Sequence, residues 1–142
     1  MQKFLGIDFG TKRVGLAISD ENGQLAFPFK ILKNDAELYD MIHNICGEED
    51  ISEIVLGESL DFSGEENVLM EKIKQFKKEL EKLNLPIHFQ KEFLTTVEAR
   101  GRGGKEKNNA RKVKKVEAQK ADAVAAALIL QRYLDRRNSP HP

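Results

Sequence analysis

The first twenty residues place a single carboxylate inside an otherwise apolar, strand-forming segment. Two β-rich runs, Lys3 to Phe9 and Val14 to Ser19, are separated by a glycine turn and predict a β-hairpin. Asp8 lies within the first run, which is otherwise apolar on both faces, so a solvent-facing aspartate on a polar strand face is a poor explanation. A carboxylate buried in a strand is costly unless a positive group meets it. Asp8 is therefore the first candidate for a metal or phosphate site.

The length and composition of the chain limit the classes of protein to which the hairpin can belong. With 142 residues, 40% of them hydrophobic, the chain is long enough to bury a core as one domain. Cys46 is the only cysteine, which excludes a disulfide framework and a thiolate zinc cluster. No apolar run approaches the length of a membrane span, and no signal segment leads the chain. We expect a soluble, cytoplasmic protein with one domain over residues 1–135 and a disordered tail over residues 136–142.

The order of the remaining patterns predicts an α/β fold. A third strand is expected at an edge or a kink because it contains Pro28. Strands that alternate with helices after this point indicate a mixed five-stranded sheet flanked by helices, with three antiparallel strands followed by two parallel ones. The later elements are expected as a strand over Gln24–Leu32, a helix over Asp35–Ile45, a strand over Glu53–Gly57, a polar loop over Glu58–Gly64, a helix ending near Leu83, a strand over Pro86–Gln90, a short helix after Thr95-Thr96 and a final helix over Val116–Leu134.

Two further carboxylates are candidates for the same site as Asp8. Asp122 lies in the final helical stretch, where almost every neighbour is Ala, Val, Leu or Ile. It could simply complement the helix dipole, but a helix that starts earlier would put it inside the helix on a largely buried surface. Glu92 falls just past the last predicted strand and is unremarkable by itself. Together these residues form a set of hard oxygen ligands that suits Mg²⁺ or Mn²⁺, and such ions can drive phosphodiester hydrolysis.

The basic residues are unevenly distributed, although 23 basic and 23 acidic side chains leave no formal net charge. From Arg100 to Lys115 the chain is rich in Lys and Arg, with Glu106 as the one acidic residue. A solvated, mobile loop is the ordinary explanation for such a segment, and contact with a phosphate backbone is the functional one. Lys12 and Arg13 at the hairpin turn, with Arg100 and Arg102, are the residues we expect to hold phosphates.

Four segments of the chain resemble the YqgF family, also called RuvX. They are Gly6–Ala17, Ile54–Gly57, Leu94–Arg100 and Asp122–Leu130, of which the first and last are the more specific. The match spans nearly the whole chain, and the order and spacing of the segments make chance similarity a poor explanation.

The resemblance implies a ribonuclease H-like fold, related to that of Holliday-junction resolvases. It also implies a nuclease that matures the 5′ end of pre-16S ribosomal RNA in the cytoplasm with a divalent metal. The family's acidic residues map onto Asp8, Glu92 and Asp122, which are the expected catalytic and metal-binding residues. Branched DNA is a related substrate, and the protein is expected to be a monomer or a weak homodimer.

This sequence departs from the family pattern at two places. Lys91 and Phe93 flank Glu92 where the family usually has Asp and Arg, and a Lys91 that pointed inward would weaken metal binding. Gly57-Glu58-Ser59 stands where the family usually has Gly-x-Pro after the middle strand, and Glu58 is an extra carboxylate there, either a spare ligand or loop surface.

Two alternatives to the nuclease stay open at the level of sequence. Lys91 and Phe93 favour a non-catalytic nucleic-acid or ribosome-biogenesis binding module that retains the fold. The segment Asp8–Lys12 also resembles the first phosphate loop of sugar kinases and actin-like ATPases, but those proteins need two such domains and this chain has room for one.

Overall fold

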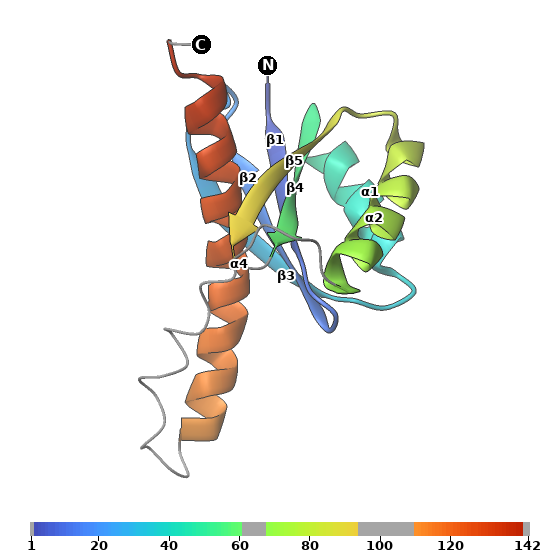
Figure 1. The fold of residues 1–142 in the computed structure, drawn as a ribbon, viewed down its shortest axis with the longest axis vertical. Helices are drawn as coiled ribbons and strands as arrows, with labels where there is room; N and C mark the ends of the chain where they lie inside the picture. Colours follow the sequence, from blue (N-terminus) through green and yellow to red (C-terminus); the bar gives the residue numbers. More distant parts are fainter. Residues whose placement is uncertain (1, 61–67, 94–109, 141–142) are drawn as a thin grey trace.

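The computed structural model describes residues 2–60, 68–93 and 110–140, and only the backbone is described for Leu60, Glu92, Phe93 and residues 110–120. Its centre is a five-stranded sheet in the order β3-β2-β1-β4-β5 (Figure 1). Strands β1 to β3 pair antiparallel, whereas β4 pairs parallel with both β1 and β5. The predicted mixed sheet is therefore confirmed. The strands are β1 Phe4–Phe9, β2 Arg13–Ser19, β3 Ala26–Lys33, β4 Glu53–Leu60 and β5 Ile87–Phe93.

Helices cover both faces of this sheet (Figure 1). Helices α1, Leu38–Glu48, and α2, Val68–Leu80, pack on one face, and a short 3-10 turn, Glu81–Leu83, follows α2. The opposite face is covered by one long helix, α4, Ala110–Arg137, whose N-terminal half projects past the end of the sheet (Figure 1). The fold thus has two cores, a larger one under α1 and α2 and a smaller one under α4.

The smaller core depends on how closely α4 approaches the central strands. A Cβ atom at Gly6 of β1 would lie 2.8 Å from the Cβ of Leu130, and one at Gly57 of β4 would lie 2.8 Å from the Cδ1 of Ile129. At Gly6 a side chain would clash with the Cβ of Leu130, which is fixed to the helix backbone, so glycine is required there. At Gly57 the close atom is the end of the Ile129 side chain, which can shift. On the helix side, small residues complete the contact, because Ala126 is fully buried there. Glycines in the sheet and alanines in the helix therefore let the two backbones lie close together.

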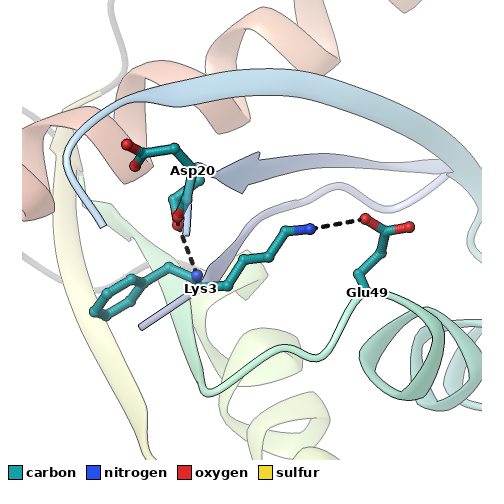
Figure 2. Close-up of polar contacts among 5 residues, drawn as sticks. Lys3, Asp20 and Glu49 are labelled. Carbon is teal, nitrogen blue, oxygen red and sulfur yellow. Dashed lines mark hydrogen bonds and ion pairs between the residues drawn. The ribbon is translucent and has the colours of Figure 1, made fainter. Parts of the chain in front are cut away.

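The N-terminal edge of β1 is fixed by polar contacts with distant residues. Lys3 Nζ donates to Glu49 Oε1 at 3.0 Å, which joins the start of β1 to the end of α1 (Figure 2). The Ser19 hydroxyl accepts a hydrogen bond from the Phe4 amide at 2.8 Å. Next to it, the side chain of Asp20 caps the following turn by accepting from the amides of Gln24 and Leu25, and the hydrogen bond from Gln24 lowers the pKa of Asp20.

The prediction of Pro28 at an edge or a kink is confirmed. Strand β3 is the last strand on its side of the sheet, and its pairing with β2 is irregular where Pro28 lies opposite Ala17. Proline has no amide hydrogen to donate, so an irregular edge strand accommodates it without an unmet donor in the ladder.

Helix α1 starts and ends three residues later than expected, and the predicted ends of several other elements are also wrong. Strands β4 and β5 each run three residues further than expected, because Glu58, Ser59 and Leu60 pair with Lys91, Glu92 and Phe93. Glu58 is therefore not in a loop, and Glu92 lies inside a strand rather than past its end. Helix α4 begins at Ala110 rather than Val116, so residues 110–115 are helical and do not belong to the expected basic loop.

The other end of α4 also extends beyond its predicted limit. The helix ends at Arg137, two residues into the segment expected as a tail, and Asn138 Nδ2 donates to the Gly23 carbonyl at 2.9 Å. The short helix expected after Thr95-Thr96 lies outside the described residues. Across the described part of the chain, no helix combines the length and apolarity that a membrane span requires.

The packing of α4 gives a test within one helix. Leu130 is fully buried against β1, whereas Leu128, two residues earlier, is 51% exposed. We expect Leu130→Ala to lower the free energy of unfolding by about 2–5 kcal/mol, because it leaves a cavity in the smaller core. Leu128→Ala is expected to stay within about 0.5 kcal/mol of the wild type. Urea denaturation measures both, and equal losses would contradict the assigned faces of α4.

Candidate active site

Asp8 lies on the face of the sheet that α4 covers, in a row of positions that carry little side-chain bulk. Its direct neighbour across the antiparallel pair is Gly15 of β2. On the other side is Gly57, which follows Leu56, the parallel partner of Ile7. Because positions 15 and 57 are glycines, Asp8 is the only one of these three neighbouring positions with a side chain directed toward α4. That side chain is half-buried. The strand prediction for Asp8 is confirmed, and the flanking glycines leave space above it.

Asp122 is brought to this row by a backbone contact with Gly15. A Cβ atom at position 15 would overlap the carbonyl oxygen of Asp122, so the helix backbone rests directly on the glycine. Because Gly15 and Asp8 are paired residues, their Cα atoms are only about 5 Å apart. Residues from the first strand and the last helix, distant in sequence, therefore meet at one place on the sheet.

The side chain of Asp122 is half-buried and continues the buried stripe of α4. Ala126, one turn later, and Leu130, two turns later, are both fully buried on this stripe. The prediction that Asp122 lies inside the helix rather than at its start is confirmed, because α4 begins twelve positions earlier, at Ala110. Complementing the helix dipole therefore does not explain this aspartate, since the dipole acts within the first turn.

Asp122 forms an ion pair with Arg13, the first residue of β2. The Arg13 Nε donates to Asp122 Oδ2 at 2.7 Å, and the two side chains are 34% and 30% exposed. The sequence predicted Arg13 as a phosphate ligand and Asp122 as a metal ligand, but gave no sign that they contact each other. Lys12, the other basic residue of this turn, is exposed at the tip of the hairpin.

A small cavity opens next to Asp8, where β1 and β4 end. It has a volume of about 80 Å³, and its polar lining consists of Asp8, Glu58 and Ser59. Ser59 is only 9% exposed. Gln90, the β5 partner of Gly57, carries a buried Oε1 atom that has no hydrogen-bond partner among the described residues. An unmatched buried acceptor on this face is a place where an additional donor or cation would be accommodated.

Glu92 is described only by its backbone, which pairs with Ser59 at the end of β4. Positions alternate between faces along a strand, so position 92 shares its face with position 90 and not with position 91. The side chain of Lys91 is exposed. An inward-pointing Lys91, the main concern raised by the sequence, is therefore not observed.

The donor chemistry of these residues fits a hard divalent cation. Asp8 and Asp122 supply carboxylate oxygens, and Gln90 supplies a carbonyl oxygen, which are the atoms that Mg²⁺ and Mn²⁺ prefer. No group of three or more His, Cys, Asp or Glu side chains that could hold a metal occurs in the part of the chain with described side chains. A third carboxylate at this site would have to come from outside that part. The backbone of Glu92 lies near the end of β5, at a position that faces the same side of the sheet as Gln90.

Other reactive residues do not join the site. Cys46 is a buried residue of α1, and burial raises the pKa of its thiol to about 11, so it is protonated at neutral pH and is no nucleophile. His88 contacts Glu53 at 2.8 Å and stacks on Tyr133, consistent with a packing residue. Arg100 and Arg102 lie outside the described residues.

Sequence reasoning missed three residues of this region. Gly15 and Gln90 carry no chemical signal in a sequence, although a strand glycine is a general sign of close backbone approach. Lys33 pairs directly with Arg13 across β2 and β3, and this neighbourhood follows from the strand register alone.

The sequence matches a known protein family over nearly its whole length. A family model described as "RuvX: Holliday junction resolvase" matches residues 2–136. The chain belongs to the RuvX family. A RuvX-like relative from Maridesulfovibrio salexigens, named "Putative pre-16S rRNA nuclease", is 37% identical over 141 residues, covering 94% of this chain and 98% of the relative. A relative with the same name from Sulfurihydrogenibium sp. is 34% identical over 139 residues, covering 96% and 92%.

Solved structures show that the RuvX chain has a ribonuclease H-like fold, the one found in RuvC resolvases. Thermus thermophilus RuvC in complex with a Holliday junction substrate superposes with a TM-score of 0.55 at 14% identity, covering 98% of this chain and 97% of that one. A second Thermus thermophilus RuvC structure gives a TM-score of 0.52 at 12% identity, covering 96% of each chain. The fold class implied by the sequence resemblance is thus confirmed.

The contact between Gly15 and Asp122 gives a direct test of how this RuvX site is built. Gly15→Ala forces a methyl group into the Asp122 carbonyl, and we expect it to lower the free energy of unfolding by at least about 1–3 kcal/mol and to displace α4. Gly47→Ala is the matched control, because a Cβ atom at this α1 position has no heavy atom within 4 Å. It should stabilise the helix by about 0.5–1 kcal/mol. Thermal and urea denaturation report both, and a Gly15→Ala protein as stable as the wild type would contradict the close contact.

Proposed function

We propose that this protein is a divalent-metal-dependent nuclease that hydrolyses phosphodiester bonds in the 5′-end processing of pre-16S ribosomal RNA. The observation that carries the proposal is the meeting of Asp8 and Asp122. Asp8 pairs with Gly15, and the backbone of Asp122 rests on Gly15, so a strand carboxylate and a helix carboxylate share one face of the sheet. Carboxylates that share one face of a sheet are suitable ligands for a divalent cation, because its charge favours their ionised forms.

The residues proposed to act in this site have separate tasks. Asp8 and Asp122 hold Mg²⁺ or Mn²⁺, and Glu92 completes the ligand set from the end of β5. When bound, the metal supplies an activated water and stabilises the leaving oxygen. Lys12 and Arg13, with Arg100 and Arg102, neutralise the phosphates of the substrate strand and so hold it over the carboxylates.

The charge of the chain supports a local rather than a general attraction to nucleic acid. Because the formal net charge is zero, the whole molecule is not a polycation. Lys12 and Arg13 put positive charge at the hairpin turn beside the site. The backbone of residues 110–115 belongs to the N-terminal half of α4, which projects past the end of the sheet (Figure 1). Phosphate contacts from such residues give affinity that falls as the salt concentration rises.

Ribosomal RNA is the proposed substrate because the relatives that cover nearly the whole chain carry that name. Branched DNA is the related possibility, since the family model and the RuvC neighbours are described by Holliday junctions. A pre-rRNA substrate would place the protein in the cytoplasm. We propose a monomer or weak homodimer with one catalytic domain over residues 1–135.

A non-catalytic nucleic-acid binding module is the second candidate. The ion pair between Arg13 and Asp122 favours it, because Asp122 already has a positive partner without any metal. A binder of this kind would need no divalent cation, so the two functions differ in their response to metal.

Cleavage of a 5′-extended small-subunit ribosomal RNA precursor tests the proposed function. We expect cleavage by the wild type with Mn²⁺ and none with EDTA, and a loss of rate on the order of 100-fold or more for Asp8→Asn and Asp122→Asn. Asp40→Asn is the control, because Asp40 is an exposed acid of α1 on the opposite face of the sheet. RNA binding without any cleavage would support the binding module instead. Equal cleavage by all variants would show that Asp8 and Asp122 are not needed for catalysis.

A further inference from the structure

Arg13 uses only part of its hydrogen-bonding capacity on Asp122. Its recorded contact is a single bond from Nε to Oδ2, at 2.7 Å. A guanidinium carries five N–H donors in a fixed fork, and four of them lie on the terminal nitrogens. The contact is therefore not the bidentate arrangement that makes arginine–carboxylate pairs strong. Among the described residues, no second contact engages the other oxygen of Asp122 or the terminal nitrogens of Arg13.

Lys33 places a second cation beside Arg13. The two residues are directly paired across β2 and β3, so their side chains leave the same face of the sheet, about 5 Å apart at their Cβ atoms. Lys33 is exposed. The backbone here is held firmly, because Asn34 donates from its amide to the Lys12 carbonyl at 3.0 Å and from Nδ2 to the Gly10 carbonyl at 2.7 Å.

Two like charges directly opposite each other destabilise a pair of strands. Asp122 offsets this cost by neutralising Arg13, and so the carboxylate serves the cation pair as a counter-ion. A divalent cation on Asp122 would withdraw that counter-ion from Arg13. The pair would then require another anion, and an oxyanion that bridges a guanidinium and an ammonium group is the suitable replacement.

We propose that Arg13 and Lys33 form a phosphate seat that exchanges Arg13 between Asp122 and the substrate. Without nucleic acid, the guanidinium occupies Asp122 and competes with the metal. When a backbone phosphate binds between Arg13 and Lys33, it takes the guanidinium from Asp122, and the carboxylate becomes available to the cation. Metal binding and phosphate binding therefore strengthen each other. This inference rests on the proposed function, because it requires Asp122 to be a metal ligand.

Thermodynamic linkage requires that RNA and metal change each other's affinity for the protein by the same factor. If RNA raises the affinity for metal by a given factor, metal must raise the affinity for RNA by the same factor. Allosteric couplings of this kind commonly amount to about 5-fold or more. Lys33 contributes to the seat only, whereas Arg13 belongs to both the seat and the Asp122 pair, so their variants should behave differently.

The experiment measures Mn²⁺ binding by electron paramagnetic resonance, with and without a short phosphorothioate RNA that resists cleavage. In the wild type we expect RNA to tighten Mn²⁺ binding about 5-fold or more. Arg13→Gln should bind Mn²⁺ more tightly than the wild type without RNA and should respond little to RNA. Arg13→Lys keeps the competing charge and should stay close to the wild type without RNA.

Lysine variants separate the seat from general charge effects. Lys33→Gln should bind RNA more weakly and show a smaller coupling, with its Mn²⁺ affinity in the absence of RNA no weaker than that of the wild type. Lys78→Gln, on the exposed side of α2, should match the wild type in both respects.

Two outcomes would contradict the inference. The first leaves the proposed nuclease function intact, and the second contradicts that function as well. If Arg13→Gln remains folded by thermal denaturation and binds Mn²⁺ no more tightly than the wild type, the exchange is wrong while the metal-dependent nuclease stands. If the wild type binds no Mn²⁺ with or without RNA, the proposed function falls together with the inference.

Discussion

The contact between the α4 backbone and Gly15 is the constraint on which the rest of the site depends. A side chain at this position would overlap the Asp122 carbonyl, so the helix can take its place only over a glycine. Gly6 and Gly57 repeat the arrangement along β1 and β4, against Leu130 and Ile129. The same close packing that builds the smaller core therefore also fixes where Asp122 lies relative to Asp8. Stability and site geometry share one cause in this fold, and a change that loosens α4 would affect both.

The electrostatics of the site follow from that geometry. Asp8 and Asp122 concentrate negative charge on one face of the sheet, while the ends of β2 and β3 bring Arg13 and Lys33 together next to it. The ion pair between Arg13 and Asp122 connects the two acidic residues with the two basic ones. A divalent cation and a phosphate are the ligands that would satisfy both groups at once, and a phosphodiester strand with its metal provides them.

The sequence patterns predicted the architecture of the fold well, but they did not predict the individual side-chain contacts. The directions of strand pairing follow from a glycine turn, short β-rich apolar runs and intervening helices, all of which are local signals. Asp8 and Asp122 were recognisable because each is an acid in an apolar segment. The ion pair of Arg13 with Asp122 was not, because it joins residues 109 positions apart and depends on strand register. The start of α4 was placed too late because its first turns are rich in Lys and Arg, which are common in loops but are also good helix formers.

The direct test of the central claim is a crystal structure of the protein with Mn²⁺ and a short RNA, with the metal located by its anomalous scattering. The account predicts a manganese peak bound by carboxylate oxygens of both Asp8 and Asp122 on the α4 face of the sheet. A peak that contacts neither residue, in crystals of a protein that cleaves RNA with Mn²⁺, would contradict it.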